Sequence, residues 1–186
     1  MNKSAFLVLL ALAGAVQASP DPREAAAREL IARFSQQLRS ALESAMQAGG
    51  PLNAVSVCHE QAPLIAQAVA GGGDWQLRRT ALRVRNPANA PDAWERTQLN
   101  EFLRLREAGA DISTLSAQTD GPDGWRYMQA IGTAPLCTVC HGPAIDPALQ
   151  AHIQRLYPKD AATGFVAGSV RGAFSLRLPP AATDAP

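Results

Sequence analysis

The sequence predicts an α+β fold in a single domain, and three observations lead to this prediction. The N-terminal part carries apolar residues at helical spacing over two long stretches, each ended by glycines. Two short runs, 125–131 and 170–178, are instead typical of strands. A chain of 186 residues, with 47% hydrophobic and 18% charged side chains, can bury one substantial core and is not a disordered tail.

A first helix is expected over residues 22–48. Asp21 is a favoured N-cap residue, and Pro22 suits the first helical position. The pair Gly49-Gly50 ends the segment. The helical stripe consists of Ala27, Leu30, Ile31, Phe34, Leu38, Leu42, Ala45 and Met46.

A second helix is expected over residues 52–70, ended by the glycines at 71–73. Its apolar stripe includes Cys58, which we therefore place on the buried face. His59 lies about 100° further round the helix and is expected to be solvated. The stripe consists of Leu52, Val55, Cys58, Ala62, Ile65 and Val69.

The middle of the chain is expected to contain one extended stretch and one helix. Residues 75–86 alternate imperfectly between polar and apolar side chains, which favours an extended conformation. The sequence NPANAP at 86–91 predicts a loop. A third helix is expected over 92–108, ending at Gly109.

The C-terminal part is expected to begin with a turn at 121–124 and a strand over 125–131. An Asp-Pro pair predicts the start of a short helix over 147–157. A last strand is expected over 170–178. Helices and strands thus alternate within one domain, which argues against a helical bundle.

The charge balance excludes some classes of partner. The chain has 17 basic and 16 acidic side chains and a formal net charge of +1. Nucleic acids and anionic membrane surfaces select strongly basic proteins, so we expect neither as a partner. After the N-terminus, no stretch is apolar and long enough for a membrane span.

The N-terminus has the features of a secretory signal peptide. Lys3 supplies a positive charge, residues 5–16 are uncharged, and Ala18 is a small residue suited to cleavage. The run is shorter than the roughly 20 residues of a membrane span. The alternative is a buried N-terminal helix, which the position at the start of the chain and the following Pro20 and Pro22 disfavour. We expect residues 1–18 to be removed and residues 19–186 to be exported to the periplasm.

Cys137, Cys140 and His141 form a C-x-x-C-H motif. Two thiols presented by one helical turn can bond to the two vinyl groups of haem, and the adjacent imidazole can bind the iron. A redox-active dithiol and an incidental disulfide are the alternatives. A zinc ribbon would need a second C-x-x-C pair, which the sequence lacks. The motif therefore predicts one covalently attached haem c.

The second axial ligand is less clear from the residues. None of the three methionines follows His141. Cys58 lies on a buried stripe without a cysteine partner, so it is either a thiolate ligand or a small buried hydrophobe. His152 shares a face with apolar residues and is better explained as a core or edge histidine, and His59 as a solvated one. Cys58 remains the leading candidate, with these alternatives open.

Three blocks of sequence resemble a known family. They are VCHEQAP at 57–63, RTALRVRNPANAPDAWE at 79–95, and the C-x-x-C-H motif followed by YPKDAATGF at 157–165. The chain resembles, from about residue 25 to 178, the bacterial c-type haem domain family of formerly unknown function. A small cyanobacterial c-type haem protein with a PAS-like fold and Cys/His axial ligation typifies this family. Ala81 departs from the family pattern, where serine is usual.

The resemblance implies a PAS-like antiparallel sheet flanked by helices. It implies that Cys137 and Cys140 hold the haem, with His141 and Cys58 as axial ligands. The basic residues Arg79, Arg83 and Arg85 of the second block could contact the haem propionates or brace the loop. Arg79 and Arg85 are preferred for the propionates because they match the family pattern.

Such a site favours electron transfer. A thiolate donates strongly, stabilises ferric iron and lowers the reduction potential. With both axial positions filled, an enzyme is the weakest reading. We therefore expect a low-potential periplasmic electron carrier. The alternative is a haem-based redox or gas sensor that binds NO or CO and acts through a separate redox or signalling partner.

Overall fold

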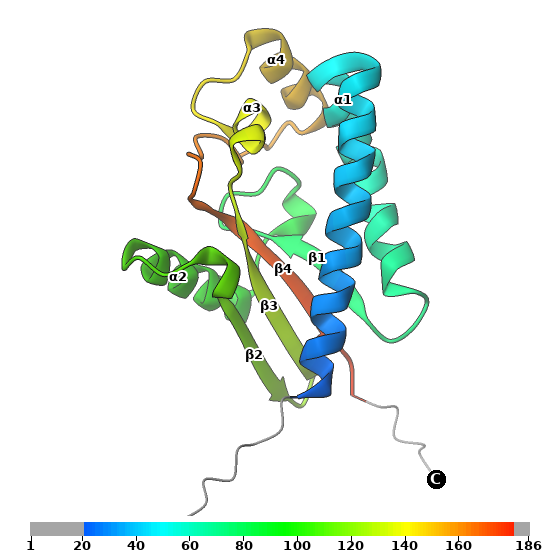
Figure 1. Cartoon of the computed structure of the whole chain (residues 1–186), viewed down its shortest axis with the longest axis vertical. Helices are drawn as coiled ribbons and strands as arrows, with labels where there is room; N and C mark the ends of the chain where they lie inside the picture. Colours follow the sequence, from blue (N-terminus) through cyan, green and yellow to red (C-terminus); the bar gives the residue numbers. More distant parts are fainter. Residues whose placement is uncertain (1–20, 181–186) are drawn as a thin grey trace, which may run out of the picture.

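The computed structural model describes residues 21–180 and has an antiparallel sheet flanked by helices (Figure 1). Four strands form the sheet in the order β1-β4-β3-β2. This confirms the predicted α+β class in a single domain, while the predicted signal peptide lies outside the described residues. The strands are β1 Gln76–Thr80, β2 Ser116–Gly121, β3 Gly124–Gly132 and β4 Val170–Leu178, and the helices are α1 Pro22–Ala70, α2 Ala93–Glu107, α3 Thr138–His141 and α4 Pro147–Leu156.

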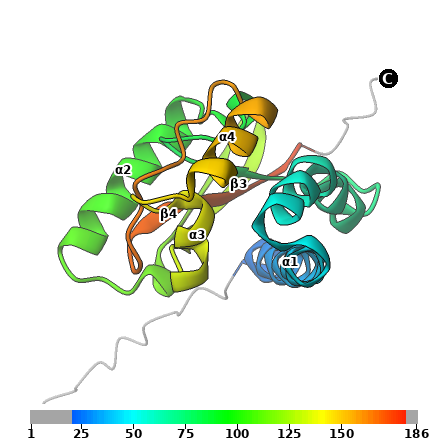
Figure 2. The same cartoon turned by 90° about the horizontal axis from the view of Figure 1, so that it is seen from above.

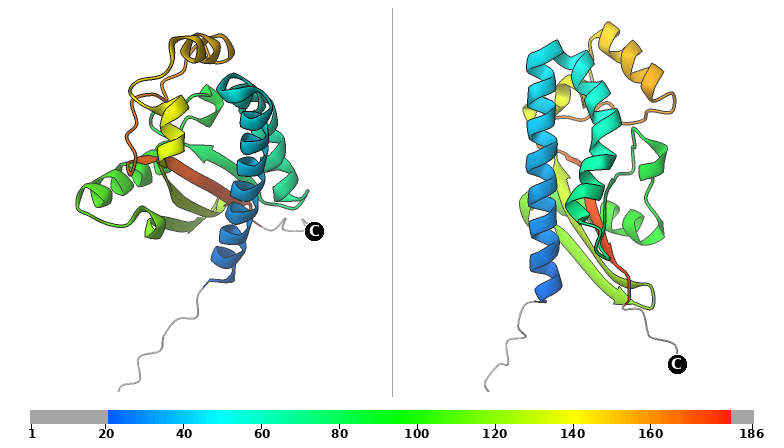
Figure 3. Two further views of the ribbon diagram at one scale, coloured as in Figure 1. Left: turned by 45° about the horizontal axis from the view of Figure 1, so that its top comes forward. Right: turned by 90° about the vertical axis from the view of Figure 1, so that its right-hand side faces the viewer.

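The two predicted N-terminal helices form the long element α1, which breaks at the predicted glycine pair. Gly50 has φ 68°, and both glycines leave helical geometry. The Asn53 side chain donates to the Ala45 carbonyl across the break at 3.0 Å. The two segments run side by side in opposite directions (Figure 3). Asp21 caps the start as predicted, and Gly71, with φ 73°, ends the element.

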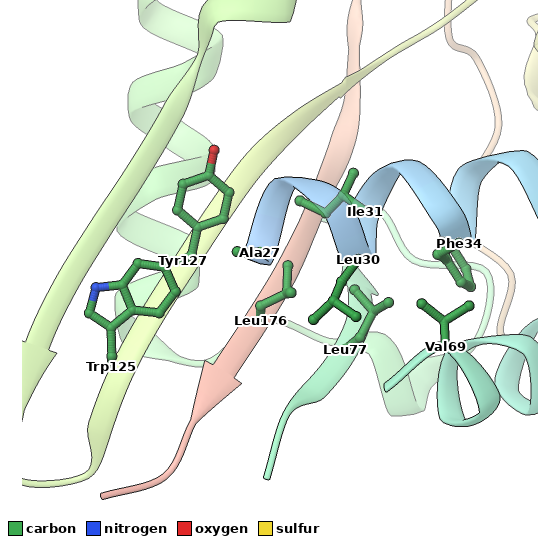
Figure 4. Close-up of a cluster of buried hydrophobic side chains, with 9 residues drawn as sticks. All are labelled: Ala27, Leu30, Ile31, Phe34, Val69, Leu77, Trp125, Tyr127 and Leu176. Atoms are coloured by element: carbon green, nitrogen blue, oxygen red, sulfur yellow. The ribbon is translucent and has the colours of Figure 1, made fainter. Parts of the chain in front are cut away.

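Side chains alternate between the two faces of the sheet and meet a different helix on each. On β3, Trp125 and Tyr127 belong to the core beneath α1, whereas Met128 and Ala130 belong to the core beneath α2. Figure 4 shows the first core, in which α1 contributes residues at the spacing i, i+3, i+4 and i+7. These four residues are Ala27, Leu30, Ile31 and Phe34.

The prediction of an extended stretch over 75–86 is correct only for its first half. β1 ends at Thr80, and a loop with a short 3-10 turn at Pro87–Asn89 follows. The Asn86 side chain accepts from the Ala88 N–H at 3.0 Å, and this local bond replaces a strand pairing. The following proline has no N–H to donate to a ladder.

β2 was not predicted from the sequence. It is an edge strand that pairs only with β3, from Ser116 opposite Gln129 to Gly121 opposite Gly124. Its sequence, SAQTDG, has no apolar alternation because most of its side chains are at least partly exposed. The predicted turn between β2 and β3 is present, and Gly124 adopts φ 98° there.

The start of the second segment of α1 lies with α3 and α4 at one end of the sheet (Figure 1). A third apolar cluster joins them, formed by Val55, Leu149, Ile153 and Tyr157, with Cys140 packed against it. This cluster positions the C-x-x-C-H motif against the helix that carries Cys58. In residues 21–180, no helix combines the length and the hydropathy needed to cross a bilayer.

Candidate functional site

The C-x-x-C-H motif forms a single helical turn. A 3-10 turn at Pro135–Cys137 leads into α3, and the Thr138 hydroxyl donates to the Pro135 carbonyl at 2.7 Å. All three cysteines of the chain are free thiols and partly exposed. Gly142 ends α3 where a Cβ would lie 2.4 Å from the Thr138 carbonyl oxygen, so a larger residue would push this turn apart.

His141 is held in one orientation by the backbone. Its Nδ1 lies 2.7 Å from the Ala162 carbonyl oxygen, which can only accept, so Nδ1 carries the proton. Burial, together with the positive charges of Arg171 and Arg85, lowers the pKa of His141 to about 3. The ring is therefore neutral, with the lone pair on Nε2 free to bind a metal.

Cys58 is half-buried on the second segment of α1. It lines a cleft of about 510 Å³ between this segment and the edge of β1. Burial raises the pKa of the Cys58 thiol, whereas the charges of Arg79 and Arg85 lower it. Burial also raises the pKa of Cys140, and the charges of Cys58 and Cys137 add to this effect. The fold thus brings the three thiols within electrostatic reach of one another.

Arg79 places a positive charge beside Cys58. Its guanidinium lies 5.7 Å from the ring centroid of Phe34 and lines the same cleft. Burial lowers the pKa of Arg79, while Cys58 and Tyr157 raise it. Within residues 21–180, its side chain makes neither a hydrogen bond nor an ion pair. A half-buried cation without a carboxylate partner favours the binding of an anionic ligand.

Arg85 holds the attachment turn in place. Its Nη2 donates to the Cys140 carbonyl at 2.6 Å and lies 3.2 Å from an Asp160 carboxylate oxygen. Its Nε is buried without a partner. The sequence left two roles open for this arginine, and the geometry accounts directly for the bracing role while leaving one donor unused.

The two histidines considered as alternative ligands have other contacts. The Nε2 of His152 lies 3.0 Å from the Ser56 hydroxyl, and its Nδ1 lies 2.9 Å from Arg155 Nη2. Both ring nitrogens are therefore engaged, which agrees with the predicted edge position. His59 is exposed, and its ring stands edge-on to Tyr157 at 4.8 Å. Of the three candidates, Cys58 is therefore the best suited to bind the iron.

Several residues of the site were not identified from the sequence. Tyr157 and Asp160 lie in the third matching block, but the residues themselves gave them no chemical role. Arg171, on β4, is the largest charged influence on His141, and only its position in the fold shows this. No sequence signal identifies the Ala162 carbonyl as the group that orients His141.

The fold and the site define a class: a single-domain α+β protein in which a C-x-x-C-H turn packs beside a helix-borne cysteine at one end of an antiparallel sheet. Within that class, the chain belongs to the Tll0287-like family, whose model matches residues 17–179. A similar solved structure is that of the cyanobacterial heme-protein Tll0287, at 27% sequence identity and a TM-score of 0.61. The match covers 86% of this chain and 97% of that one. No curated protein matches the chain significantly.

Proposed function

We propose that this protein binds one haem c, attached through Cys137 and Cys140, with His141 and Cys58 as axial ligands. The observation that carries this proposal is the bond from Nδ1 of His141 to the Ala162 carbonyl at 2.7 Å, next to two free thiols. Haem-binding histidines are oriented by such a second bond, which leaves Nε2 for the iron. The similar cyanobacterial protein is a heme-protein, which supports the same reading.

The chemistry of the surrounding residues fits haem. Each thiol would add across one vinyl group, its sulfur bonding to one carbon and its proton going to the other. The two propionates of haem are anions, and Arg79 offers a half-buried cation without a carboxylate partner. The unpartnered Nε of Arg85 offers a second donor.

Cys58 suits the second axial position for two reasons. Its helix packs on the cluster that also holds Cys140, so it approaches the site from a separate element. Although burial raises the pKa of its thiol, the charges of Arg79 and Arg85 act in the opposite direction and favour the thiolate, which is the form that binds iron. This assignment also gives a role to the third cysteine of a chain that we expect to be exported.

Low-potential electron transfer outside the cytoplasm is the activity that this ligand set supports best. Bound haem supplies a one-electron iron couple, and a thiolate ligand favours the ferric state. The side chains of the site would hold the cofactor in place, with His141 and Cys58 as the iron ligands. The partner would be a separate redox protein.

A sensor of redox state or of NO or CO is the second candidate, and one observation favours it. Cys58 lies on the segment of α1 that follows the non-helical Gly49-Gly50 break. Loss of the bond to Cys58 on reduction would free this segment to shift at its glycine hinge. The shift would be transmitted to a separate signalling partner.

Optical and EPR spectra of the wild type and Cys58→Ala test the ligand set. We expect Cys58→Ala to keep its covalent haem, to lose the low-spin thiolate signature and to have a higher reduction potential. His59→Ala is the matched control, because it removes the neighbouring candidate on the same helix. An unchanged low-spin spectrum in Cys58→Ala would exclude thiolate ligation.

Carbon monoxide then separates the two activities. A carrier should show fast electron self-exchange and no CO binding to the reduced protein. A sensor should bind CO with displacement of Cys58.

A further inference from the structure

A second cavity lies on the opposite side of the sheet from the Cys58 cleft. Its volume is about 440 Å³, and it shares no lining residue with that cleft. α2 contributes to its wall, whereas the Cys58 cleft is bounded by α1, and the two helices lie on opposite faces of the sheet (Figure 2). Its apolar lining comprises Leu82, Leu99, Leu103, Phe165, Val166 and Val170.

Two arginines stand at this cavity without acidic partners. The guanidinium carbon of Arg83 lies 4.0 Å from the ring centroid of Phe165, and that of Arg171 lies 4.6 Å from it. Arg83 donates to the Thr163 carbonyl at 2.8 Å, and Arg171 to the Arg83 carbonyl at 3.3 Å. Within residues 21–180, neither has a carboxylate within salt-bridge distance.

The arginine on β4 keeps its charge despite its burial. Burial, together with the neighbouring charges of Arg85 and Arg79, lowers the pKa of Arg171 to about 10. It is therefore still a cation at neutral pH. The cavity combines a mainly apolar wall with two cations held by carbonyls and by one aromatic ring.

We propose that this cavity binds a small amphipathic carboxylic acid. Ligand pockets of this size are mostly apolar, with a few polar groups that fix orientation. The hydrocarbon part would lie against the leucines of α2, and the carboxylate would take hydrogen bonds from Arg83 and Arg171. Guanidinium groups match carboxylates in geometry as well as charge.

Phe165 connects this cavity to the C-x-x-C-H turn. Its N–H donates to the His141 carbonyl at 2.9 Å, and its ring stands edge-on to the His141 ring at 6.5 Å. A bound carboxylate would neutralise Arg171, whose charge acts on His141. If His141 binds haem iron, as proposed above, the acid would stabilise the ferric state. By linkage, the ferric protein would bind the acid more tightly than the ferrous protein.

Calorimetric titration of the ferric holoprotein with n-alkanoates from butanoate to decanoate tests the site. We expect saturable one-to-one binding of octanoate, with affinity rising about fourfold per methylene until the cavity is full. Octan-1-ol should bind more weakly than octanoate. Arg171→Gln should weaken octanoate binding about tenfold or more, since it removes a charged donor.

Two further variants keep the test decisive. Leu103→Trp should block the cavity from the opposite wall if Arg171→Gln proves unstable. Arg104→Gln is the matched control and should bind octanoate like the wild type, because Arg104 is an exposed α2 residue paired with Glu101. No saturable binding, equal affinity for octanoate and octan-1-ol, or unchanged binding in both cavity variants would overturn the proposal.

The reduction potential, measured with and without saturating octanoate, tests the coupling separately. We expect a negative shift in the wild type and none in Leu103→Trp. Binding without a shift would refute the coupling while supporting the pocket. The Cys58→Ala spectra report on the haem ligands independently of either result.

Discussion

Arg78 and Arg79 are neighbours on β1, yet they enter two very different environments. Arg78 pairs with Glu95, a carboxylate that is 1% exposed, on the α2 face of the sheet. Arg79 enters the α1 face beside Cys58 and meets no carboxylate there. The two arginines differ because consecutive side chains of a strand point to opposite faces of the sheet.

Around Glu95, every charge has a partner within the protein. Its carboxylate accepts from the Ser175 hydroxyl at 2.6 Å and from the Asp92 N–H at 2.9 Å, and lies 3.6 Å from Arg126. This network ties α2 to β1, β3 and β4. Around the C-x-x-C-H turn, only Arg85 pairs with Asp160, whereas Arg79, Arg83 and Arg171 form no ion pair within residues 21–180. The charges around Glu95 therefore offset one another, although the Nε of Arg126 is buried without a hydrogen-bond partner. The unpaired positive charges around the C-x-x-C-H turn instead favour the binding of an anion.

Removal of both attachment thiols should have the largest effect on the site around the C-x-x-C-H turn. We expect Cys137→Ala/Cys140→Ala to lose all covalent haem, because no sulfur remains to bond to the vinyl groups. Haem staining after denaturing electrophoresis measures this. Cys58→Ala should retain the stain and is the control for the third cysteine. Stain that survives in the double variant would refute attachment through this motif.

Hydrogen exchange of the same double variant should show which elements lose amide protection when haem is absent. We expect protection to fall in α3, α4 and the second segment of α1, where repulsion among the arginines is no longer offset by haem. Protection at the contacts of Glu95 should stay unchanged. A uniform loss across both regions would show that the two environments are not independent.

Replacement of Glu95 should have the largest effect on stability. Glu95→Ala leaves Arg78 and Arg126 facing a buried gap, and we expect a loss of about 3–5 kcal/mol in the free energy of unfolding. Urea denaturation measures this. Glu101→Ala breaks an exposed pair with Arg104 on the same helix and should cost under about 1 kcal/mol. Similar costs for both variants would contradict the buried network.

The two arginines of β1 can be compared directly. Arg78→Leu should lower stability by breaking the pair with Glu95, with little effect on the reduction potential. In the protein without haem, Arg79→Leu should leave stability nearly unchanged or raise it, because it removes a half-buried charge that has no carboxylate partner within residues 21–180. It should also lower the potential, since one positive charge near the iron is lost. Denaturation and redox titration of both variants test this, and interchanged results would refute the assignment of Arg79.

The sequence was most informative where its signals are local. Glycine pairs and Asp caps predicted α1, α2 and α4 to within one or two residues, and C-x-x-C-H predicted the single turn of α3. Non-local features escaped prediction: β2 is a polar edge strand held by its pairing to β3, and Arg171 reaches His141 only through the fold. The loop after Thr80 was misassigned because bonds such as Asn86 to Ala88 compete with strand pairing.

Asp92 lies at the solvent-exposed edge of the Glu95 network, and we expect its replacement to have the smallest effect on the free energy of unfolding. Its side chain caps α2 by accepting from the Glu95 N–H at 2.9 Å, so Asp92→Ala should cost about 1 kcal/mol at pH 7. Although burial raises the pKa of Asp92, the bonds from the Glu95 N–H and Arg126 outweigh it and hold the pKa below its usual 3.8. A lowered pKa means that the stabilisation is complete above about pH 4 and is lost as the pH falls through the folded-state value. The difference in unfolding free energy between the wild type and Asp92→Ala should therefore shrink towards pH 2, and a difference that stays constant would show that the cap acts without its charge.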